Sequence, residues 1–361
     1  MAASITVLNE PTFVSDSGLD FNLSALTLSS KYNIIIHRVY DPLNRFDSEF
    51  EFLQDPAHNS NTLIILWHPV EMGAWDQIWV GRLNNAVAGK PYKLIYLTGC
   101  TSRLDLDQHF NIQFDYQFLP VFDVRTASQW REPAEIILKK SKKFVCLNAK
   151  DVGHRRYIFG YLNQSHLKDQ GIVSYRCTNG VQESFNDFSI GRGFTAMQML
   201  RINEISTGCV DAIPLKIDEF NFNNALPRST FLDTYVNIVN ETDFCNVPYS
   251  YRRSFVTEKT FNAIANNQLF IVVGHAYSLE LLRDLGYKTF DGIIDESYDR
   301  IENNGDRLMA VTECIDRFLQ RPIEQIQEDY AKAVEIIQHN RDWLFSQSLN
   351  ARMQEIVDRY A

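Results

Sequence analysis

The chain has 361 residues, a length that predicts two domains or one large one. Apolar residues make up 45% and charged residues 22%, values that exclude a disordered or fibrous protein. Its 45 acidic and 35 basic side chains give a net charge near −10. That balance argues against a general binder of nucleic-acid backbones, although it leaves room for a local basic groove.

Several other classes of protein are disfavoured by simple patterns. No run of apolar residues is long enough for a transmembrane helix, and Met1–Pro11 lacks the features of a signal peptide. The six cysteines are scattered without a Cys-x-x-Cys pair, and the histidines form no His-x-x-x-His pair. We therefore expect a cytoplasmic protein with free thiols and no structural zinc.

The first part of the chain alternates short apolar runs with amphipathic stretches. The runs are continuous rather than alternating, which is typical of parallel strands covered on both faces. The predicted strands are Ser4–Leu8, Asn33–Arg38, Thr62–Trp67, Lys93–Thr98 and Phe118–Phe122. The predicted helices are Leu23–Ser30, Asp76–Ala88 and Thr126–Lys139.

A second alternating series follows a basic segment, residues 139–143, which resembles an exposed linker or a solvated helix end. Its predicted strands are Phe144–Leu147, Ile172–Tyr175, Thr234–Val239, Leu269–Gly274 and Thr289–Ile293. Its predicted helices are His154–Asn163, Thr257–Asn266 and Leu279–Leu285, with Thr195–Arg201 inside an irregular insertion, Asn179–Ser229. Apolar residues at helical spacing then predict helices through the tail.

This organisation predicts an α/β protein with two domains and a returning tail. The predicted boundaries are 1–140, 141–340 and 341–361, the last a helix that packs back on the first domain. In open α/β sheets, ligands bind at the carboxyl ends of strands, where helix N-termini point. Functional residues should therefore follow strand ends.

The richest segment for function is Thr234–Arg307. Thr257 is placed to cap a helix whose first turn holds Glu258 and Lys259. A carboxylate suits the positive end of the helix dipole, but a lysine opposes it. Lys259 is explained if an anion such as a diphosphate binds the same helix end, and the alternative is a plain capped helix with a solvated lysine.

The segment 255–259, Phe-Val-Thr-Glu-Lys, follows a strand that leads to a Glu and precedes a helix and an apolar strand ending in Gly. This arrangement resembles the donor-binding motif of the α-1,3-fucosyltransferases and of related glycosyltransferases. The segments 281–290 and 294–299 resemble the viral and phage members. The resemblance implies the GT-B fold, in which two Rossmann-like domains bind a nucleotide sugar in the cleft between them.

The resemblance also implies roles for individual residues. Glu258 would accept hydrogen bonds from the ribose hydroxyls, Lys259 would neutralise the diphosphate, and Glu241 would lie near the nucleoside or sugar. Glu241 lies further from Thr257 than in the family pattern. Thr257 and Gly274 complete the predicted donor site on this segment. His275 could contact the sugar or phosphate, with a plain turn histidine as the alternative, and Tyr251, Arg252 and Arg253 lie on the loop that would border the donor.

A second basic cluster follows the strand at Phe144–Leu147. In the fucosyltransferases an arginine at the start of the next helix pairs with the donor phosphates, and Arg155 and Arg156 fall at that position. Guanidinium groups match phosphate oxygens bidentately. The alternative is a surface arginine pair on an amphipathic helix.

The catalytic base is expected on the first domain. Direct displacement at an anomeric carbon needs a base for the acceptor hydroxyl, and the loop after Thr62–Trp67 offers Glu71 and His68. Alternatives are Asp16, Asp76 and Asp123. The Asp105-Leu106-Asp107 triplet could hold a metal ion, but such acidic triplets are common by chance, and no metal is predicted.

These observations predict a glycosyltransferase that moves a sugar from a nucleoside diphosphate sugar to a hydroxyl acceptor. The resemblance implies an inverting reaction without metal or cofactor, releasing UDP or GDP. The expected acceptor is a glycan or small carbohydrate, and the alternative is a hydroxymethylated base in virus DNA, flipped out of the duplex. A catalytically inactive nucleotide- or sugar-binding module is the alternative of another class. A virus-encoded member would act in the host cytoplasm, without a membrane span or an obligate protein partner.

Overall fold

The structure is a computed structural model that describes residues 5–8, 32–38, 51–68, 77–98, 101–102, 115–148, 152–164, 167–175, 194–207, 228–244, 253–254 and 256–360. The chain forms two compact units. The N-terminal unit comprises residues 1–128, 250–253 and 347–361, and the C-terminal unit comprises residues 129–249 and 254–346. The sequence places the divisions between units near residues 140 and 341, and the structure places them after residues 128 and 346.

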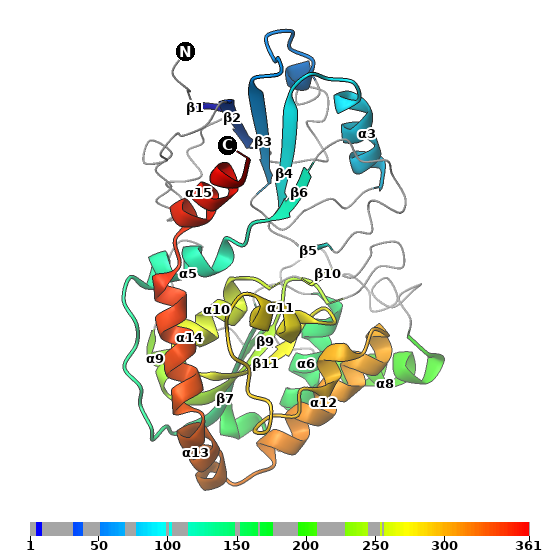
Figure 1. Ribbon diagram of the computed structural model, residues 1–361. Helices are drawn as coiled ribbons and strands as arrows, with labels where there is room; N and C mark the ends of the chain where they lie inside the picture. Colours follow the sequence, from blue (N-terminus) through cyan, green and yellow to red (C-terminus); the bar gives the residue numbers. More distant parts are fainter. Residues whose placement is uncertain are drawn as a thin grey trace. The chain divides into compact units, whose positions relative to one another are not determined.

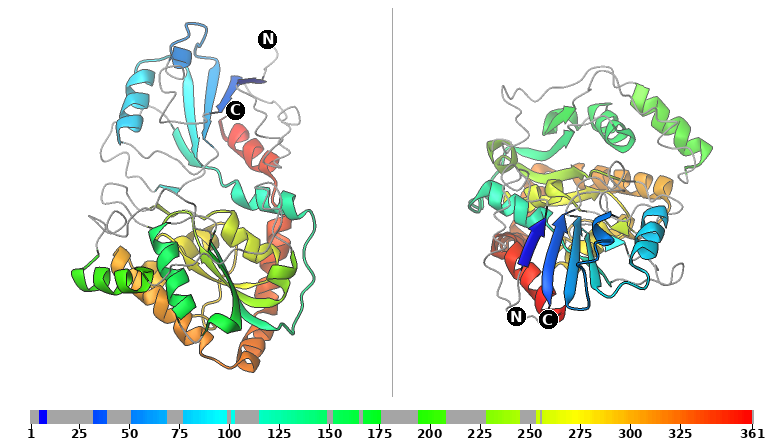
Figure 2. Two further views of the ribbon diagram at one scale, coloured as in Figure 1. Left: turned by 180° about the vertical axis from the view of Figure 1, so that it is seen from behind. Right: turned by 90° about the horizontal axis from the view of Figure 1, so that it is seen from above.

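The N-terminal unit is built on a parallel sheet of five strands in the order β1-β2-β3-β4-β6. These strands are Ile5–Leu8, Asn33–Arg38, Thr62–His68, Lys93–Thr98 and Asp115–Phe118. Figure 2 shows them side by side, in blue to cyan. Consecutive side chains of β3, residues 63–66, are fully buried, as expected for a strand covered on both faces. The prediction of a parallel α/β sheet is confirmed.

Further elements of this unit are α3, Gln77–Val87, the short strand β5, Thr101–Ser102, and α15, Leu349–Tyr360. The helix α5, Phe122–Trp130, begins in this unit. The predicted helix at Leu23–Ser30 lies outside the described residues.

Two predictions near the end of this unit are wrong, and proline explains both. In place of the predicted strand Phe118–Phe122, the structure has β6, Asp115–Phe118. This strand ends before Pro120, because proline has no N–H for a sheet. The predicted helix Thr126–Lys139 starts earlier and stops at Trp130, because Pro133 disfavours helical backbone at the residue before it. Arg131 at φ 62° turns the chain out of the helix.

The C-terminal unit is built on a second parallel sheet, in the order β11-β9-β7-β8. The strands are β7, Lys142–Asn148, β8, Gly171–Tyr175, β9, Thr234–Asn240, and β11, Leu269–Val273. Every residue of β9 and β11 is buried. The chain is therefore an α/β protein with two parallel-sheet domains, as predicted.

Helices cover both faces of this sheet. One side carries α6, Gly153–Gln164, and α12, Asn304–Leu319, and the other carries α10, Glu258–Ala265, α13, Ile323–Lys332, and α14, Val334–Ser346 (Figure 1). Smaller or outlying elements are η2, Lys168–Gln170, α8, Ala196–Thr207, α9, Arg228–Leu232, β10, Arg253–Ser254, α11, Ser278–Asp284, and η3, Ser297–Arg300.

The predicted strand Thr289–Ile293 is wrong, because Glu296 organises this stretch as a loop. The Glu296 carboxylate accepts hydrogen bonds from the backbone N–H of Phe290, at 2.7 Å, and from the Thr289 hydroxyl, at 2.8 Å. Gly292 at φ 87° makes a tight turn, and only the bridge between Asp291 and Ile294 has strand-like pairing. An apolar run with a carboxylate partner for its backbone does not need a sheet neighbour.

The basic segment 139–143 is exposed only in part, because Lys140 and Lys143 are buried while Lys139 and Ser141 are exposed. Lys140 is 5% exposed, and its Nζ lies 4.9 Å from the ring centroid of Tyr330. Lys143 is also buried, and its ammonium donates to the carbonyl oxygens of Leu319 and Arg321 at 2.8 and 2.6 Å. Lys140 lies just before β7 and Lys143 near its start, and their long apolar stems cover the edge of the core.

Replacing Lys140 with methionine should raise the free energy of unfolding at pH 7 by about 1–2 kcal/mol, because a buried charge gives way to an apolar side chain. Burial lowers the pKa of Lys140 from 10.5 to about 8, against the opposing charge of Asp233. The unfolded chain therefore binds more protons between pH 8 and 10.5, and the wild type should regain stability relative to the variant across that window. Urea unfolding measures both effects. Lys139, which is exposed, provides the control: Lys139→Met should change stability by less than about 0.5 kcal/mol.

The tail returns to the N-terminal unit, as predicted. The helix α15 buries Leu349, Met353, Ile356 and Val357. Its Arg352 donates from Nη1 and Nη2 to the two carboxylate oxygens of Asp123. Among the described residues, no helix is long and apolar enough to span a membrane.

Candidate functional site

The sheet of the C-terminal unit reverses its direction of growth between β7 and β9. The chain runs from β7 outward to β8 and then returns to place β9 on the other side of β7. Such a switch point, at the carboxyl ends of the strands, is where open α/β sheets bind ligands. Here the strand ends are tied together by Asn240, whose side-chain amide donates to the Asn148 side-chain oxygen at 2.8 Å.

Glu241, directly after β9, is the hub of this switch point. Its side chain is fully buried, and Oε1 accepts hydrogen bonds from the Thr257 backbone N–H, at 3.1 Å, and the Thr260 hydroxyl, at 2.6 Å. Oε2 accepts from the Thr257 hydroxyl at 2.5 Å. A buried carboxylate needs such donors to offset its desolvation. Glu241 thus fixes the N-terminus of α10 to the end of β9.

The N-terminus of α10 has the capped geometry that the sequence predicts. Thr257 is the N-cap, with extended backbone and a side chain that accepts from the Lys259 backbone N–H. Burial of Phe261 and Ile264 on the core face of α10 orients this helix end toward the carboxyl edge of the sheet. The cap leaves a positive helix end beside the switch point.

Lys259 folds its side chain back over that helix end. Its Nζ donates to the hydroxyls of Thr242, at 2.9 Å, and Thr257, at 3.2 Å, and forms an ion pair with Glu258 at 2.7 Å. Both charged side chains remain partly exposed, at 27% for Lys259 and 29% for Glu258. The cation is therefore held at the helix end and is still accessible to a ligand.

A second cation reaches the same place from α6. Arg155, only 3% exposed, donates from Nε and Nη2 to the backbone carbonyl oxygen of Glu241 at 3.3 and 2.8 Å. Glu241 therefore connects the two predicted phosphate-binding groups, α10 through its carboxylate and Arg155 through its carbonyl. Arg156, which is half-buried, turns the other way, and its Nε lies 3.5 Å from the Tyr175 hydroxyl at the end of β8.

His154 adds a neutral group beside Arg155. Its Nε2 lies 3.0 Å from the Glu241 carbonyl oxygen, so Nε2 carries the proton, and its ring stacks on Phe244. Burial and then the charge of Arg155 lower the pKa of His154 to about 3. The imidazole is thus uncharged at neutral pH, and of these two side chains only Arg155 carries a positive charge.

Arg307 on α12 completes the cluster, and the sequence analysis missed it. The side chain is 1% exposed, and its guanidinium donates to the carbonyl oxygens of Gly274, at 3.1 Å, and Phe244, at 2.6 Å. The guanidinium also lies 4.5 Å from the centre of the Phe244 ring. It joins the loops that follow β9 and β11. The available signal was its position on the apolar face of a helix, where a charged residue requires partners.

Gly274 lies against Glu241 in the structure. A Cβ at Gly274 would come within 3.3 Å of the Glu241 Cβ and 3.2 Å of the Ser278 hydroxyl oxygen. A larger residue would press on the hub of the switch point. Close approach of a ligand to Gly274 stays a prediction.

Other predicted residues cannot be located in the same way. Glu71, Asp16, Asp76, the Asp105–Asp107 triplet, Tyr251 and Arg252 lie outside the described residues. His68 is the last residue of β3, at the carboxyl edge of the N-terminal sheet. Asp123, an alternative base, is buried in its pair with Arg352. Within the described ranges, no group of three His, Cys, Asp or Glu residues could hold a metal ion.

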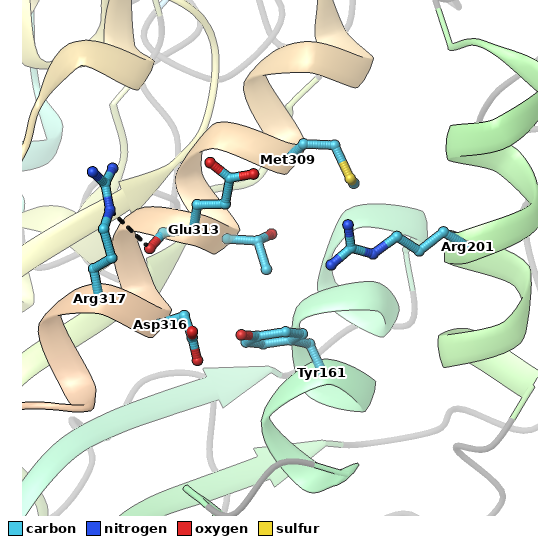
Figure 3. A pocket seen from close by; sticks show the side chains of 7 residues that line it. Tyr161, Arg201, Met309, Glu313, Asp316 and Arg317 are labelled. Atoms are coloured by element: carbon cyan, nitrogen blue, oxygen red, sulfur yellow. Dashed lines mark hydrogen bonds between the residues drawn. The ribbon is translucent and has the colours of Figure 1, made fainter.

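A separate cavity of about 330 Å³ lies between α6, α8 and α12 (Figure 3). Its charged lining residues are Arg201, Arg317, Glu313 and Asp316, and Tyr161 faces Asp316 across it. Two arginines against two carboxylates give no net attraction for an anion, and none of these residues follows a strand end. The switch point, where a capped helix N-terminus lies at the carboxyl ends of the strands, is the better candidate for a nucleotide.

Comparison with known proteins gives only distant structural similarities. No protein-family model and no curated protein matches the chain. It is similar to the T4 phage β-glucosyltransferase bound to its substrate UDP-glucose, with 10% identity, a TM-score of 0.37, and coverage of 100% of this chain and 99% of that one. A structure of a DNA-modifying β-glucosyltransferase, described with and without uridine diphosphoglucose, has 9% identity, a TM-score of 0.35, and coverage of 91% and 80%. An α1,3-fucosyltransferase with GDP has 11% identity, a TM-score of 0.31, and coverage of 93% and 96%.

Proposed function

We propose that the protein is a GT-B glycosyltransferase that transfers a sugar from a nucleoside diphosphate sugar to a hydroxyl acceptor. The observation that carries the proposal is that two cations meet at the β7–β9 switch point. Arg155 donates to the Glu241 carbonyl oxygen, and Lys259 donates to the hydroxyl of the next residue, Thr242. Two fixed cations beside a capped helix end are suited to a diphosphate.

The donor would be bound through groups of complementary chemistry. Lys259 and Arg155 would neutralise the diphosphate, with Arg156 at its margin. Glu258, which is partly exposed and an acceptor, would bind the ribose hydroxyls. Glu241 has both carboxylate oxygens engaged by threonines, so its proposed role is to position Arg155 and α10 rather than to contact the donor.

The proposed reaction is a single displacement with inversion. The acceptor oxygen forms a bond to the anomeric carbon while the bond from that carbon to the diphosphate oxygen breaks, and a base takes the hydroxyl proton. Fixed cations stabilise the charge that develops on the leaving diphosphate. Glu71 is the proposed base and His68 the second candidate, both at the carboxyl end of β3 or in the loop after it.

The proposed acceptor is a carbohydrate hydroxyl. The net charge of −10 disfavours a duplex as the acceptor, because DNA binding draws on a positive field. The experiment below also tests a hydroxymethylated base in DNA as the acceptor.

Thermal-shift measurements with UDP-, GDP-, CDP- and ADP-sugars test the proposal. We expect one donor class to raise the melting temperature, since a ligand at 100 times its Kd adds about 2.7 kcal/mol of stability. Nucleotide release should then require a carbohydrate acceptor and should persist in EDTA. Release with hydroxymethylated DNA alone would identify the other acceptor.

Three results would contradict the proposal. If no nucleotide sugar stabilises the chain, the donor site is wrong. If a nucleotide binds but is never released with any acceptor, the protein is a binding module. If EDTA abolishes transfer and a divalent metal restores it, the metal-independent reaction is wrong.

A further inference from the structure

The loops that follow β9 and β11 are joined by a carboxylate–imidazole contact. Asp243 lies just beyond Glu241, and His275 lies just beyond Gly274, at the same carboxyl edge of the sheet. Asp243 Oδ2 is 3.4 Å from His275 Nε2. The His275 side chain is 1% exposed, whereas that of Asp243 is 40% exposed. The carboxylate is therefore anchored by the protein and is still partly exposed to a ligand.

The carboxylate of Asp243 is held in its ionised form. Burial opposes ionisation, but the contact with His275, the nearby His154 and the backbone N–H of Phe244 together lower the pKa of Asp243 to about 2. Oδ1 accepts the Phe244 N–H at 2.9 Å, which fixes the plane of the group. At neutral pH Asp243 can only accept hydrogen bonds.

The position of Asp243 indicates what it could recognise. The preceding residue, Thr242, accepts a hydrogen bond from Lys259, the cation proposed to bind the diphosphate. A carboxylate there would repel a phosphate, so it does not serve the diphosphate itself. It suits a neutral neighbour of the diphosphate that carries hydroxyl donors, which is the chemistry of a sugar.

We propose that Asp243 binds hydroxyl groups of the sugar that is transferred, an inference that rests on the proposed function. His275 is a positioning residue that holds the carboxylate at the open edge of the site. The pair would distinguish the intact nucleotide sugar from the nucleoside diphosphate that remains after transfer. This assignment adds a sugar subsite to the proposed phosphate-binding groups, Lys259 and Arg155.

The test compares two affinities in one variant. Calorimetric titration of Asp243→Asn with UDP and UDP-glucose, or with GDP and GDP-fucose if guanosine is preferred, should show at least a ten-fold loss for the sugar conjugate. Affinity for the nucleoside diphosphate alone should stay within about two-fold. Asp243→Ala should show the same selective loss, and His275→Gln a smaller one.

A matched control is available in Asp295, which is 43% exposed and pairs with Arg317 at 2.7 Å. Asp295→Asn should leave both affinities unchanged. If the Asp243 variants have a lower melting temperature but an unchanged ratio of the affinities for the nucleotide sugar and the nucleoside diphosphate, Asp243 only stabilises the fold. That result would overturn the assignment. Failure of the wild-type chain to bind any nucleotide would instead overturn the proposed function, and this subsite with it.

Discussion

Replacing Lys259 with alanine should lower kcat/KM for sugar transfer by at least about 100-fold, the usual loss when a fixed electrostatic group at a developing charge is removed. The ammonium is already held by the hydroxyls of Thr242 and Thr257, so binding of the diphosphate requires little reorganisation. Stability should change by less than about 1 kcal/mol, because the ion pair with Glu258 is partly solvated. Initial rates of nucleotide release and urea unfolding measure the two quantities.

A matched control for Lys259 is Lys332 on α13. It is also ion-paired, with Asp329 at 3.1 Å, but it is far more exposed and distant in sequence from the switch point. Lys332→Ala removes the same net charge and should leave the transfer rate unchanged. Equal nucleotide affinity in Lys259→Ala and the wild type would show that this lysine is a solvated residue of a capped helix. A rate loss in both variants would indicate an effect of overall charge.

The strands were predictable because a strand buried on both faces has apolar side chains at consecutive positions of the sequence. Asn33–Arg38 and Lys93–Thr98 have the predicted bounds, since an apolar run covered on both faces needs no information from the rest of the chain. The errors came where a distant partner or a proline decides the outcome. Residues 289–293 look like a strand until Glu296 supplies acceptors for their polar groups.

The candidate site was predictable in its local part only. The N-cap of α10 at Thr257 follows from adjacent residues. The roles of Arg307 and of the Asp243–His275 pair depend on contacts between separate loops, such as the hydrogen bond from Arg307 to Phe244, 63 residues away. Lys143 likewise looks solvated until carbonyl oxygens of residues 319 and 321 surround its ammonium. A buried charge is identified by its partners, which the local sequence does not contain.

Replacing Arg352 with alanine should lower the free energy of unfolding by about 3–5 kcal/mol, the usual effect of removing one partner from a buried ion pair. Arg352 donates to both carboxylate oxygens of Asp123, at 2.9 and 2.6 Å, and to the Pro120 carbonyl oxygen at 2.7 Å. Asp123 is 0% exposed, so its charge would lose its cation without gaining water.

Equilibrium urea unfolding measures this loss, and Arg359 on the same helix provides the control. Arg359 is exposed and donates to the neutral side-chain oxygen of Gln117 at 3.2 Å, so Arg359→Ala should cost less than about 0.5 kcal/mol. Combining Arg352→Met with Asp123→Asn should recover part of the stability, because no buried charge is then left unpaired. Equal effects of Arg352→Ala and Arg359→Ala would contradict the buried pair as the anchor of α15. Recovery in the double variant, with loss in the single one, would show that the tail helix is fixed to the N-terminal unit by charge as well as by its apolar face.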